Sequence, residues 1–403
     1  MKRRDFLTAG SLAAGGALLT SRLSFANTPA NGKSRFVFVI LRGALDGLAA
    51  VPPYGDRDYP ALRRDLAMQA NDVLRLNDTF GLHPSLAFLG ESYGAHELVV
   101  FHAIAGPYRE RSHFDGQDVL ESGFVRAHVS QSGWLNRALG SIPAGRTCDK
   151  ESGIALGQNI PLVMRGPAAV TSWSPSKLAA LDEDTLERIT DLYAGDPLLA
   201  ARLADALAAD AIAESPLSAD SSAAMPNRAG GAARYTEVMH ATAEFLRREN
   251  GPKVAVFDTT GWDTHANEGA AQGQLAGRLA ALDAGLRMLK DQLGPVWNDT
   301  AVLLATEFGR TAAVNGTRGT DHGTATAAFL LGGAVKGGRV VTDWPGLSSR
   351  SLYQGRDLMP TLDLRSVLKG VMQDHLGVPA RALDATVFPD SVAARTLTGL
   401  VRT

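Results

Sequence analysis

The stretch KVAVFDTTGWDTHANEG (residues 253–269) joins an apolar run to a polar loop that holds Asp263 and His265. An unbroken apolar run of this length is typical of a parallel strand buried on both faces. In open α/β sheets, ligands bind beyond the carboxyl ends of such strands. Carboxylate and imidazole together are ligands for a divalent metal ion, and Gly261 supplies the bend that lets both face one ion. The alternative is a polar loop that only closes the strand, with Trp262 as an aromatic lid.

Four further apolar runs have the same character. They are SRFVFVILRG (34–43), ELVVFHAIAG (97–106), DTAVLLATEFG (299–309) and TAAFLLGG (326–333). Helical stretches lie between the runs, and the helix expected at 270–294 keeps its leucines on one face. These are Leu275, Leu279, Leu282, Leu286 and Leu289. Strands that alternate with helices predict an α/β fold with a mostly parallel central sheet and helices on both faces.

The middle of the chain differs in composition. Residues 174–214 are rich in Ala and Leu and helical in pattern, and residues 215–231 have the composition of a flexible linker. We expect a helical insertion over 174–231, beside or over the site, inside a domain that spans 34–403. A helix from Ala232 to Glu249 then returns the chain to the sheet.

Overall composition sets limits on function. The chain has 403 residues and a formal net charge of −2, which gives no electrostatic reason to expect a nucleic-acid partner. Cys148 is the only cysteine, so an internal disulfide and a thiolate metal cluster are both excluded.

The N-terminus has the features of an export signal. Arg3 and Arg4 precede a short, weakly apolar stretch, and small residues at Ser24 and Ala26 suit cleavage. The paired arginines predict a twin-arginine signal peptide at 1–26, a twin-arginine translocase as partner and a periplasmic or secreted protein. The stretch is too short and Gly-rich for a stable membrane span. The alternative is a cytosolic helix that begins with two arginines by chance.

Acidic and imidazole groups follow four of the five runs. They are Asp46; then Ser112, His113 and Asp115; then Asp263 and His265; then Glu307, Asp321 and His322. Such groups are ligands for zinc or manganese, and their recurrence at successive strand ends favours one shared site. Each also has a structural alternative. Asp46 and Ser112 are possible helix caps, Glu307 and Arg310 a surface ion pair, and Asp321 and His322 a hydrogen-bonded loop pair.

Several motifs together resemble one known family. They are RGALDGL, PYRERSHFDGQD, GWDTHANEG, ATEFGRT and GTDHGTATAAFLLGGAVKGGRV, behind the twin-arginine leader. The set is similar to the bacterial domain of unknown function 1501, a family grouped with the alkaline phosphatase and sulfatase superfamily. The resemblance covers most of the chain after the leader and implies an alkaline-phosphatase-like fold.

The resemblance also implies roles for particular residues. Asp46, Asp263, His265 and His322 match the superfamily's metal-binding positions, and Ser112 stands where its nucleophile opens a helix after the second strand. At Glu307 the chain departs from the pattern, because the superfamily has Asp-His there and this chain has Glu307-Phe308. His113, Asp115 or Asp321 would have to replace the missing imidazole.

The function that this resemblance implies is that of an exported, metal-dependent hydrolase of phosphate or sulfate esters. One or two divalent ions, zinc or manganese, would assist in-line attack by Ser112 on a small anionic ester. Arg111 and Arg310 are candidates to grip an anionic oxygen, although ordinary ion pairs would explain them equally. The alternative from another class is an exported metal-binding or structural protein of the same fold without turnover.

Overall fold

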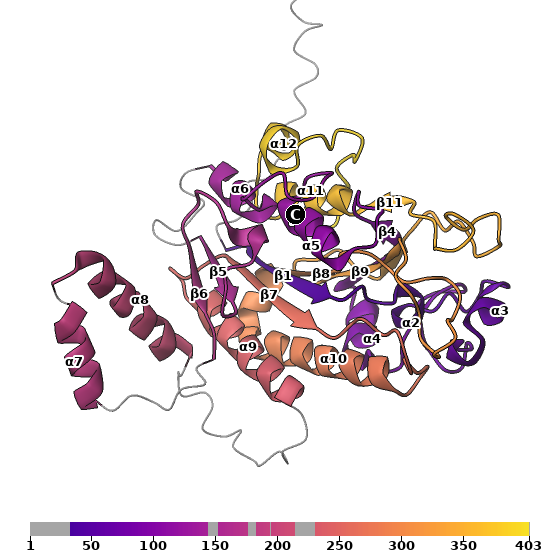
Figure 1. Ribbon diagram of the computed structural model, residues 1–403, viewed down its shortest axis with the longest axis horizontal. Coiled ribbons are helices and arrows are strands. Elements are labelled where there is room, and N and C mark those ends of the chain that lie inside the picture. The colour runs from indigo at the N-terminus through magenta and orange to yellow at the C-terminus, as the bar shows by residue number, and fades with distance from the viewer. Residues whose placement is uncertain (1–32, 144–151, 176–182, 194, 214–229, 403) are drawn as a thin grey trace, which may run out of the picture.

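A nine-stranded sheet forms the centre of the protein in a computed structural model that describes residues 33–143, 152–175, 183–193, 195–213 and 230–402 (Figure 1). In spatial order the strands are β10 (Arg339–Val341), β4 (Leu98–Ala105), β9 (Thr326–Leu331), β8 (Thr300–Ala305), β1 (Arg35–Arg42), β7 (Val254–Thr260), β5 (Gly153–Leu156) and β6 (Val170–Trp173), and β11 (Leu362–Asp363) also pairs with β4. β9 is antiparallel to β4 and β8, and the other neighbouring strands are parallel. The mostly parallel α/β sheet expected from the sequence is therefore confirmed.

The central strands form because their side chains are apolar on both sides. β1 shows the alternation, with Phe36, Phe38 and Ile40 packed in one core and Val37, Val39 and Leu41 in the other. All six are fully buried. Each such side chain contributes roughly 1.5–3 kcal/mol by leaving water. The five expected runs correspond to β1, β4, β7, β8 and β9, whereas the short strands β5 and β6 had no clear signal.

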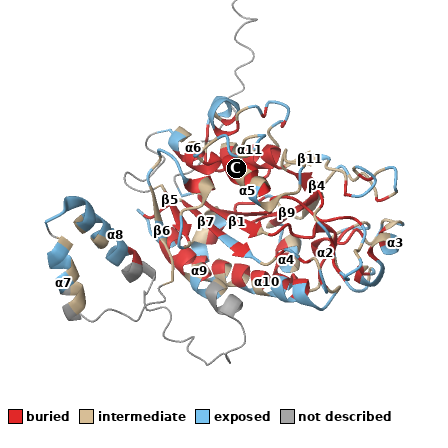
Figure 2. Cartoon of the chain, viewed as in Figure 1, coloured by how far each residue is buried: buried red, intermediate tan, exposed pale blue. Residues whose placement is uncertain are grey.

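Helices cover both faces of the sheet (Figures 1 and 2). One core lies under α4 (Ala87–Gly94), α9 (Gly230–Arg247) and α10 (Gln274–Leu293), and the other under α5 (His113–Ser122), α6 (Trp134–Ser141) and α11 (Leu364–Asp374). The five leucines expected on one face of α10 are all buried in the first core. Figure 2 shows the buried residues gathered on the sheet and on the inner sides of these helices.

Shorter segments connect these elements. They are α2 (Gly47–Ala50), α3 (Tyr59–Arg63), η1 (Arg64–Leu66), η2 (Leu162–Met164), η4 (Gly294–Asp299), α12 (Ala380–Ala382), η5 (Leu383–Val387) and the two-stranded pair β2 (Leu74–Arg75) and β3 (Gly81–Leu82). None of the helices within the described ranges combines the length and the apolar character that a bilayer crossing requires.

The segment expected as an insertion contains two helices, α7 (Glu183–Tyr193) and α8 (Pro197–Ala213). α8 contacts α9 and β6, so the pair lies at the β6 edge of the sheet, to the left in Figure 1. The helix expected at 232–249 is α9. The signal peptide expected at 1–26, Cys148 and most of the linker at 215–231 lie outside the described residues.

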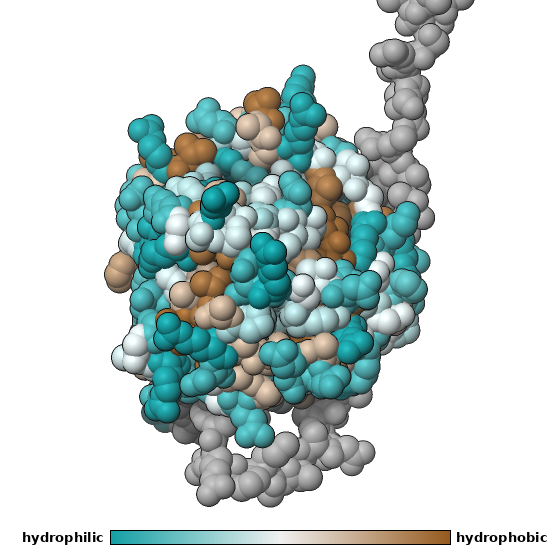
Figure 3. All heavy atoms as spheres, turned by 90° about the vertical axis from the view of Figure 1, so that its right-hand side faces the viewer, coloured by the Kyte–Doolittle hydropathy of each residue, from teal (hydrophilic) through white to brown (hydrophobic). Residues whose placement is uncertain are grey.

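The direction of β9 decides which loops meet. β1, β7 and β8 run parallel, so their carboxyl ends share one edge of the sheet. Because β9 runs the opposite way, its first residue, Thr326, lies at that same edge. The loop before β9 therefore joins the loops that follow the parallel strands. Figure 3 views the side of the molecule toward which these strands point and shows a largely hydrophilic surface with small hydrophobic patches.

Candidate metal centre

Three imidazoles and one carboxylate converge at this carboxyl edge. His322 Nε2 lies 2.9 Å from His113 Nε2 and 3.0 Å from His265 Nε2. Asp263 Oδ1 lies 3.2 Å from His322 Nε2 and 3.1 Å from His265 Nε2. Ligand atoms of His113, Asp263 and His322 all lie within 4.8 Å of one another, a spacing that could hold a metal ion. The four residues come from the start of α5, the loop after β7 and the loop before β9.

The outer nitrogen of each ring faces an oxygen that only accepts hydrogen bonds. The pairs are His113 Nδ1 with Glu307 Oε1 at 2.7 Å, His265 Nδ1 with Asp321 Oδ1 at 3.3 Å, and His322 Nδ1 with the Arg111 carbonyl oxygen at 3.1 Å. Each Nδ1 therefore carries the proton, and in the neutral ring each Nε2 presents a lone pair to the cluster. Three lone pairs and a carboxylate repel one another unless a cation lies among them. The donor set thus fits a divalent metal ion, since oxygen partners at Nδ1 orient metal-bound imidazoles in the same way.

Glu307 holds His113 from inside the protein. Its side chain is buried, and Oε1 accepts from the backbone N–H of Gly43 at 2.9 Å, from His113 Nδ1 and from Gln117 Nε2 at 3.2 Å, while Oε2 accepts from Thr306 Oγ1 at 2.8 Å. Burial raises the pKa of Glu307, but the hydrogen bond from His113 and the other donors outweigh it and lower the pKa. The same hydrogen bond raises the pKa of His113. Glu307 therefore orients an imidazole from behind rather than facing the cluster.

Asp263 is fixed by a buried arginine. Arg310 Nη1 donates to Asp263 Oδ1 at 2.6 Å, and its Nη2 and Nε donate to the carbonyl and hydroxyl oxygens of Thr320 at 2.6 and 3.2 Å. Burial raises the pKa of Asp263, but Arg310 together with the imidazoles of His265 and His322 outweighs burial, so the pKa of Asp263 is lowered. Arg310 thus pairs with Asp263 and not with Glu307, three residues before it. The bend that brings Asp263 to the edge is at Gly261, whose φ is +93°.

Asp46 does not join the ligand atoms. It accepts from the backbone N–H of Ala49 at 3.0 Å as the N-cap of α2, and from Arg63 Nη2 at 2.5 Å and Thr320 Oγ1 at 3.1 Å. Glu268, also fully buried, lies in the same group, and burial together with the Asp46 charge raises the pKa of Glu268 to about 8. Asp46 is therefore a helix cap, which was the structural alternative for this residue, and it lies in a buried polar layer behind the cluster.

Ser112 stands at the N-cap position of α5, directly before His113, and its side chain makes no capping hydrogen bond. Its backbone N–H donates to Tyr108 Oη at 3.1 Å. The preceding Arg111 has a φ of +62°, and its guanidinium is held by Asp357 Oδ2 at 2.8 Å and Gln354 Oε1 at 2.7 Å. A non-glycine residue in this conformation persists only where its surroundings fix it, and such residues gather at functional sites. The Arg111 side chain is thus engaged in holding the loop.

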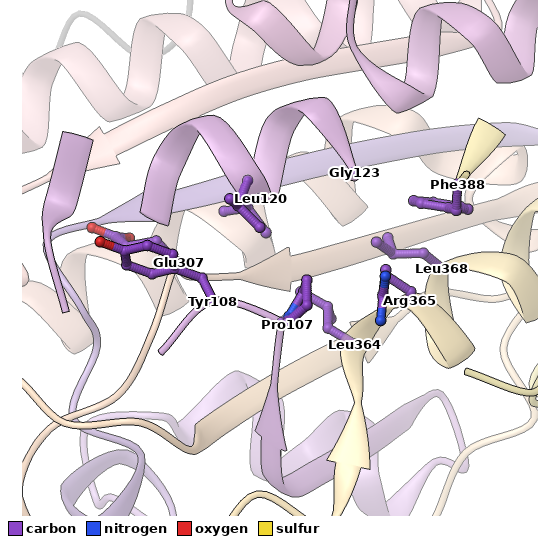
Figure 4. A pocket seen from close by; sticks show the side chains of 11 residues that line it. Pro107, Tyr108, Leu120, Gly123, Glu307, Leu364, Arg365, Leu368 and Phe388 are labelled. Atoms are coloured by element: carbon purple, nitrogen blue, oxygen red, sulfur yellow. The ribbon is translucent and has the colours of Figure 1, made fainter. Parts of the chain in front are cut away.

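The cluster is reached from solvent and not from the interior. The side chains of Asp263 and His265 are 40% and 44% exposed. On the inner side, the cavity beside Glu307 has a volume of only about 10 Å³ (Figure 4). It is lined by α5, α11 and the segment after β4, including Tyr108, Leu120, Leu364 and Phe388. A space of that size holds about one water molecule and excludes a substrate.

Most of the residues expected from the sequence meet here. His113, Asp263, His265 and His322 form the cluster, and Glu307, Asp321 and Arg310 contact it. Asp115 bonds to His128 Nε2 at 2.9 Å instead. Sequence reasoning missed Arg63, which lies in no motif. It also missed Thr320 and Glu268, which lie inside the quoted motifs GTDHGTAT and GWDTHANEG but were not singled out as site residues.

Fold and cluster together define an α/β protein with a His/Asp group of metal-binding type at the carboxyl edge of its sheet. Residues 33–387 match the family described as "Protein of unknown function (DUF1501)". The chain belongs to that family, as its motifs indicated. No curated protein matches the chain.

Several solved structures are distantly similar to the chain. The lipoteichoic acid synthase LtaP from Listeria monocytogenes is 10% identical with a TM-score of 0.42, over 91% of this chain and 76% of that one. The C-terminal periplasmic domain of EcEptC from Escherichia coli, in complex with Zn, is 10% identical with a TM-score of 0.43, over 91% and 89%. A 2-O GAG sulfatase is 12% identical with a TM-score of 0.37, over 92% and 76%. These values are too low for the chemistry of those proteins to be transferred to this chain.

Proposed function

We propose that this protein is an exported, metal-dependent hydrolase of phosphate or sulfate esters with an alkaline-phosphatase-like domain. The observation that carries the proposal is the set of three imidazoles whose Nδ1 atoms all face oxygen acceptors while their Nε2 atoms meet beside Asp263. It supports a site for a divalent ion, zinc or manganese, in which His113, Asp263 and His322 would be ligands and His265 a fourth.

The residues around the cluster suit ester hydrolysis. A bound divalent ion would stabilise negative charge on the ester oxygens and favour the ionised form of a nearby hydroxyl. Ser112, which is next to His113 and makes no capping hydrogen bond, is the proposed nucleophile. Its Oγ would bond to phosphorus or sulfur while the ester oxygen leaves as an alcohol that gains a proton from water. A second water would then attack phosphorus or sulfur and break the bond to Oγ, which would release phosphate or sulfate and return a proton to Ser112. Arg310 keeps Asp263 ionised and in place.

Metal analysis and an ester panel test the proposal together. We expect protein purified without chelator to contain a divalent metal, and the variants Asp263→Ala and His265→Ala to lose most of it, because each removes a ligand. A panel of phosphate and sulfate esters should show hydrolysis by wild type. Ser112→Ala should keep the metal and lose hydrolysis. Wild type without metal would defeat the metal centre. Metal without hydrolysis of any ester would make this a metal-binding protein.

The proposal includes an export route and a domain division. Residues 1–26 would be the twin-arginine signal, 34–403 the domain, and 174–231 its helical insertion. Replacing Arg3 and Arg4 with lysine should leave the protein in the cytoplasm, because the translocase recognises the guanidinium pair. Unchanged export of that double variant, measured by fractionation, would contradict the route.

A further inference from the structure

A cavity with a partly polar lining lies at the carboxyl ends of β5 and β7. These two strands lie side by side in the sheet (Figure 1). Its volume is about 430 Å³, within the range of about 300–1,000 Å³ typical of small-molecule sites. Apolar side chains form part of its lining, namely Leu156, Pro175, Val238 and Phe257. Its polar side chains include Gln158, Asn159, Tyr235, Asp258 and Arg278.

The topology of the sheet places this cavity where a ligand is expected. β5 and β7 are parallel neighbours. β5 continues outward to β6, whereas β7 continues through α10 to β8, on the far side of β1. Connections that leave adjacent parallel strands in opposite directions open a crevice between their carboxyl ends, and ligands of open α/β sheets bind in such crevices. The cavity is therefore a feature of the fold and not an accident of surface packing.

Arg278 supplies a cation to the cavity. Its side chain is exposed, and Nη1 makes one long hydrogen bond of 3.5 Å to the Thr260 carbonyl oxygen. The guanidinium lies against Gly261, where a Cβ would come within 2.2 Å of Nη1. The bare Cα of Gly261 thus makes room for the guanidinium beside the loop that carries Asp263. Among the described residues, most of the guanidinium's donors have no hydrogen-bond acceptor and can face an anionic group.

Acceptors and donors for hydroxyl groups complete the lining. The Asp258 side chain faces the cavity and is 42% exposed, and its charge is offset by an ion pair with Arg42. Tyr235 adds a phenol, which is a hydrogen-bond donor at neutral pH, and burial raises its pKa further above that range. Gln158 and Asn159 add exposed amides from the segment after β5.

We propose that this cavity binds a hydroxylated organic acid, such as an acidic sugar, with the acid on Arg278 and hydroxyl groups on Asp258 and the amides. If the proposed function holds, this ligand is the acidic, non-reacting part of the substrate. The binding itself does not depend on the proposed function. The distance fits, because the three residues from Thr260 to Asp263 span at most about 11 Å. A polar path also joins the two places, from Asp258 through Arg42 and Gln117 to Glu307.

Direct binding tests the proposal without any turnover. The probes are glucuronate and galacturonate, with glucose and galactose as uncharged counterparts, titrated into wild type and variants by calorimetry or saturation-transfer NMR. We expect an acid to bind at least about tenfold more tightly than its neutral counterpart, and Arg278→Met to remove that preference, because it deletes a charged hydrogen-bond donor. Arg278→Lys should retain part of it.

Two controls separate this cavity from the metal centre. Arg287→Met removes another guanidinium from α10, one that pairs with Glu91 outside the cavity, and should leave binding unchanged. His322→Ala, which removes a proposed metal ligand, should also keep acid binding. The proposal would be overturned if neither acid bound with a Kd below about 10 mM. Equal binding of neutral sugars, or acid binding lost in His322→Ala and kept in Arg278→Met, would overturn it as well.

Discussion

Glu307→Gln is the sharpest test of how the metal centre is held. Glu307 is buried, and its Oε1 accepts from His113 Nδ1 at 2.7 Å. Glutamine has almost the same volume, and its amide oxygen can still accept from His113 and from the Gly43 N–H. Its amide nitrogen would face Thr306 Oγ1, which can act as an acceptor in place of its present role as donor to Glu307. The substitution therefore removes one negative charge with little change in packing.

The expected effect is on metal affinity. Without the carboxylate, the His113 ring loses the charge that makes its Nε2 a stronger donor to a metal. Changes to such outer partners of metal-bound histidines typically reduce affinity by about 10–100-fold, or about 1.4–2.8 kcal/mol. We expect the zinc affinity of Glu307→Gln to be lower than that of wild type by a factor in that range. The free energy of unfolding of the metal-free protein should change little.

Competition with a fluorescent chelator measures the affinity, and urea unfolding of the metal-free protein measures stability. Asp115→Asn is the matched control, because Asp115 is an acid two residues after His113 that bonds to His128 and not to the cluster. An affinity of Glu307→Gln equal to that of wild type would refute the assigned role. So would an equal loss in Asp115→Asn.

Asp46→Asn should keep the metal but lower the free energy of unfolding, measured by urea unfolding, by about 3–5 kcal/mol. The reason is that it leaves the buried Arg63 charge without its closest partner. Loss of metal at unchanged stability would instead make Asp46 a ligand. Burial lowers the pKa of His102 to about 4, from about 6.5 when unfolded. The unfolded chain then binds more protons between these values, so we expect stability to fall by up to about 3 kcal/mol as the pH drops from 6.5 to 4, and His102→Gln to show a shallower fall in urea titrations. Gly261→Ala should lower the free energy of unfolding by about 1–2 kcal/mol, because φ is +93° and the new Cβ would meet the Arg278 guanidinium at 2.2 Å. A melting temperature equal to wild type would show that this bend is not strained.

Local patterns were enough to predict the main elements of the fold. The apolar runs at 34–43, 97–106 and 253–261 became β1, β4 and β7, because burial on both faces requires continuous apolar sequence. The leucines of α10 lie on its buried face because their 3.6-residue spacing is local information. β5 and β6 escaped notice because four residues are too few for a periodic pattern to show.

The amino-acid sequence shows which chemical groups follow the strands, and Asp263, His265 and His322 could be named from it. The surroundings of these groups follow from the tertiary structure. Asp46 and Glu307 both follow apolar strands and look alike in sequence, yet one pairs with Arg63 in the interior and the other orients His113. These outcomes depend on partners far apart in the chain, and on the antiparallel direction of β9, which brings the loop containing His322 to the carboxyl edge. Strand direction and long-range pairing are set by the packing of the whole sheet, and no local stretch of sequence encodes them.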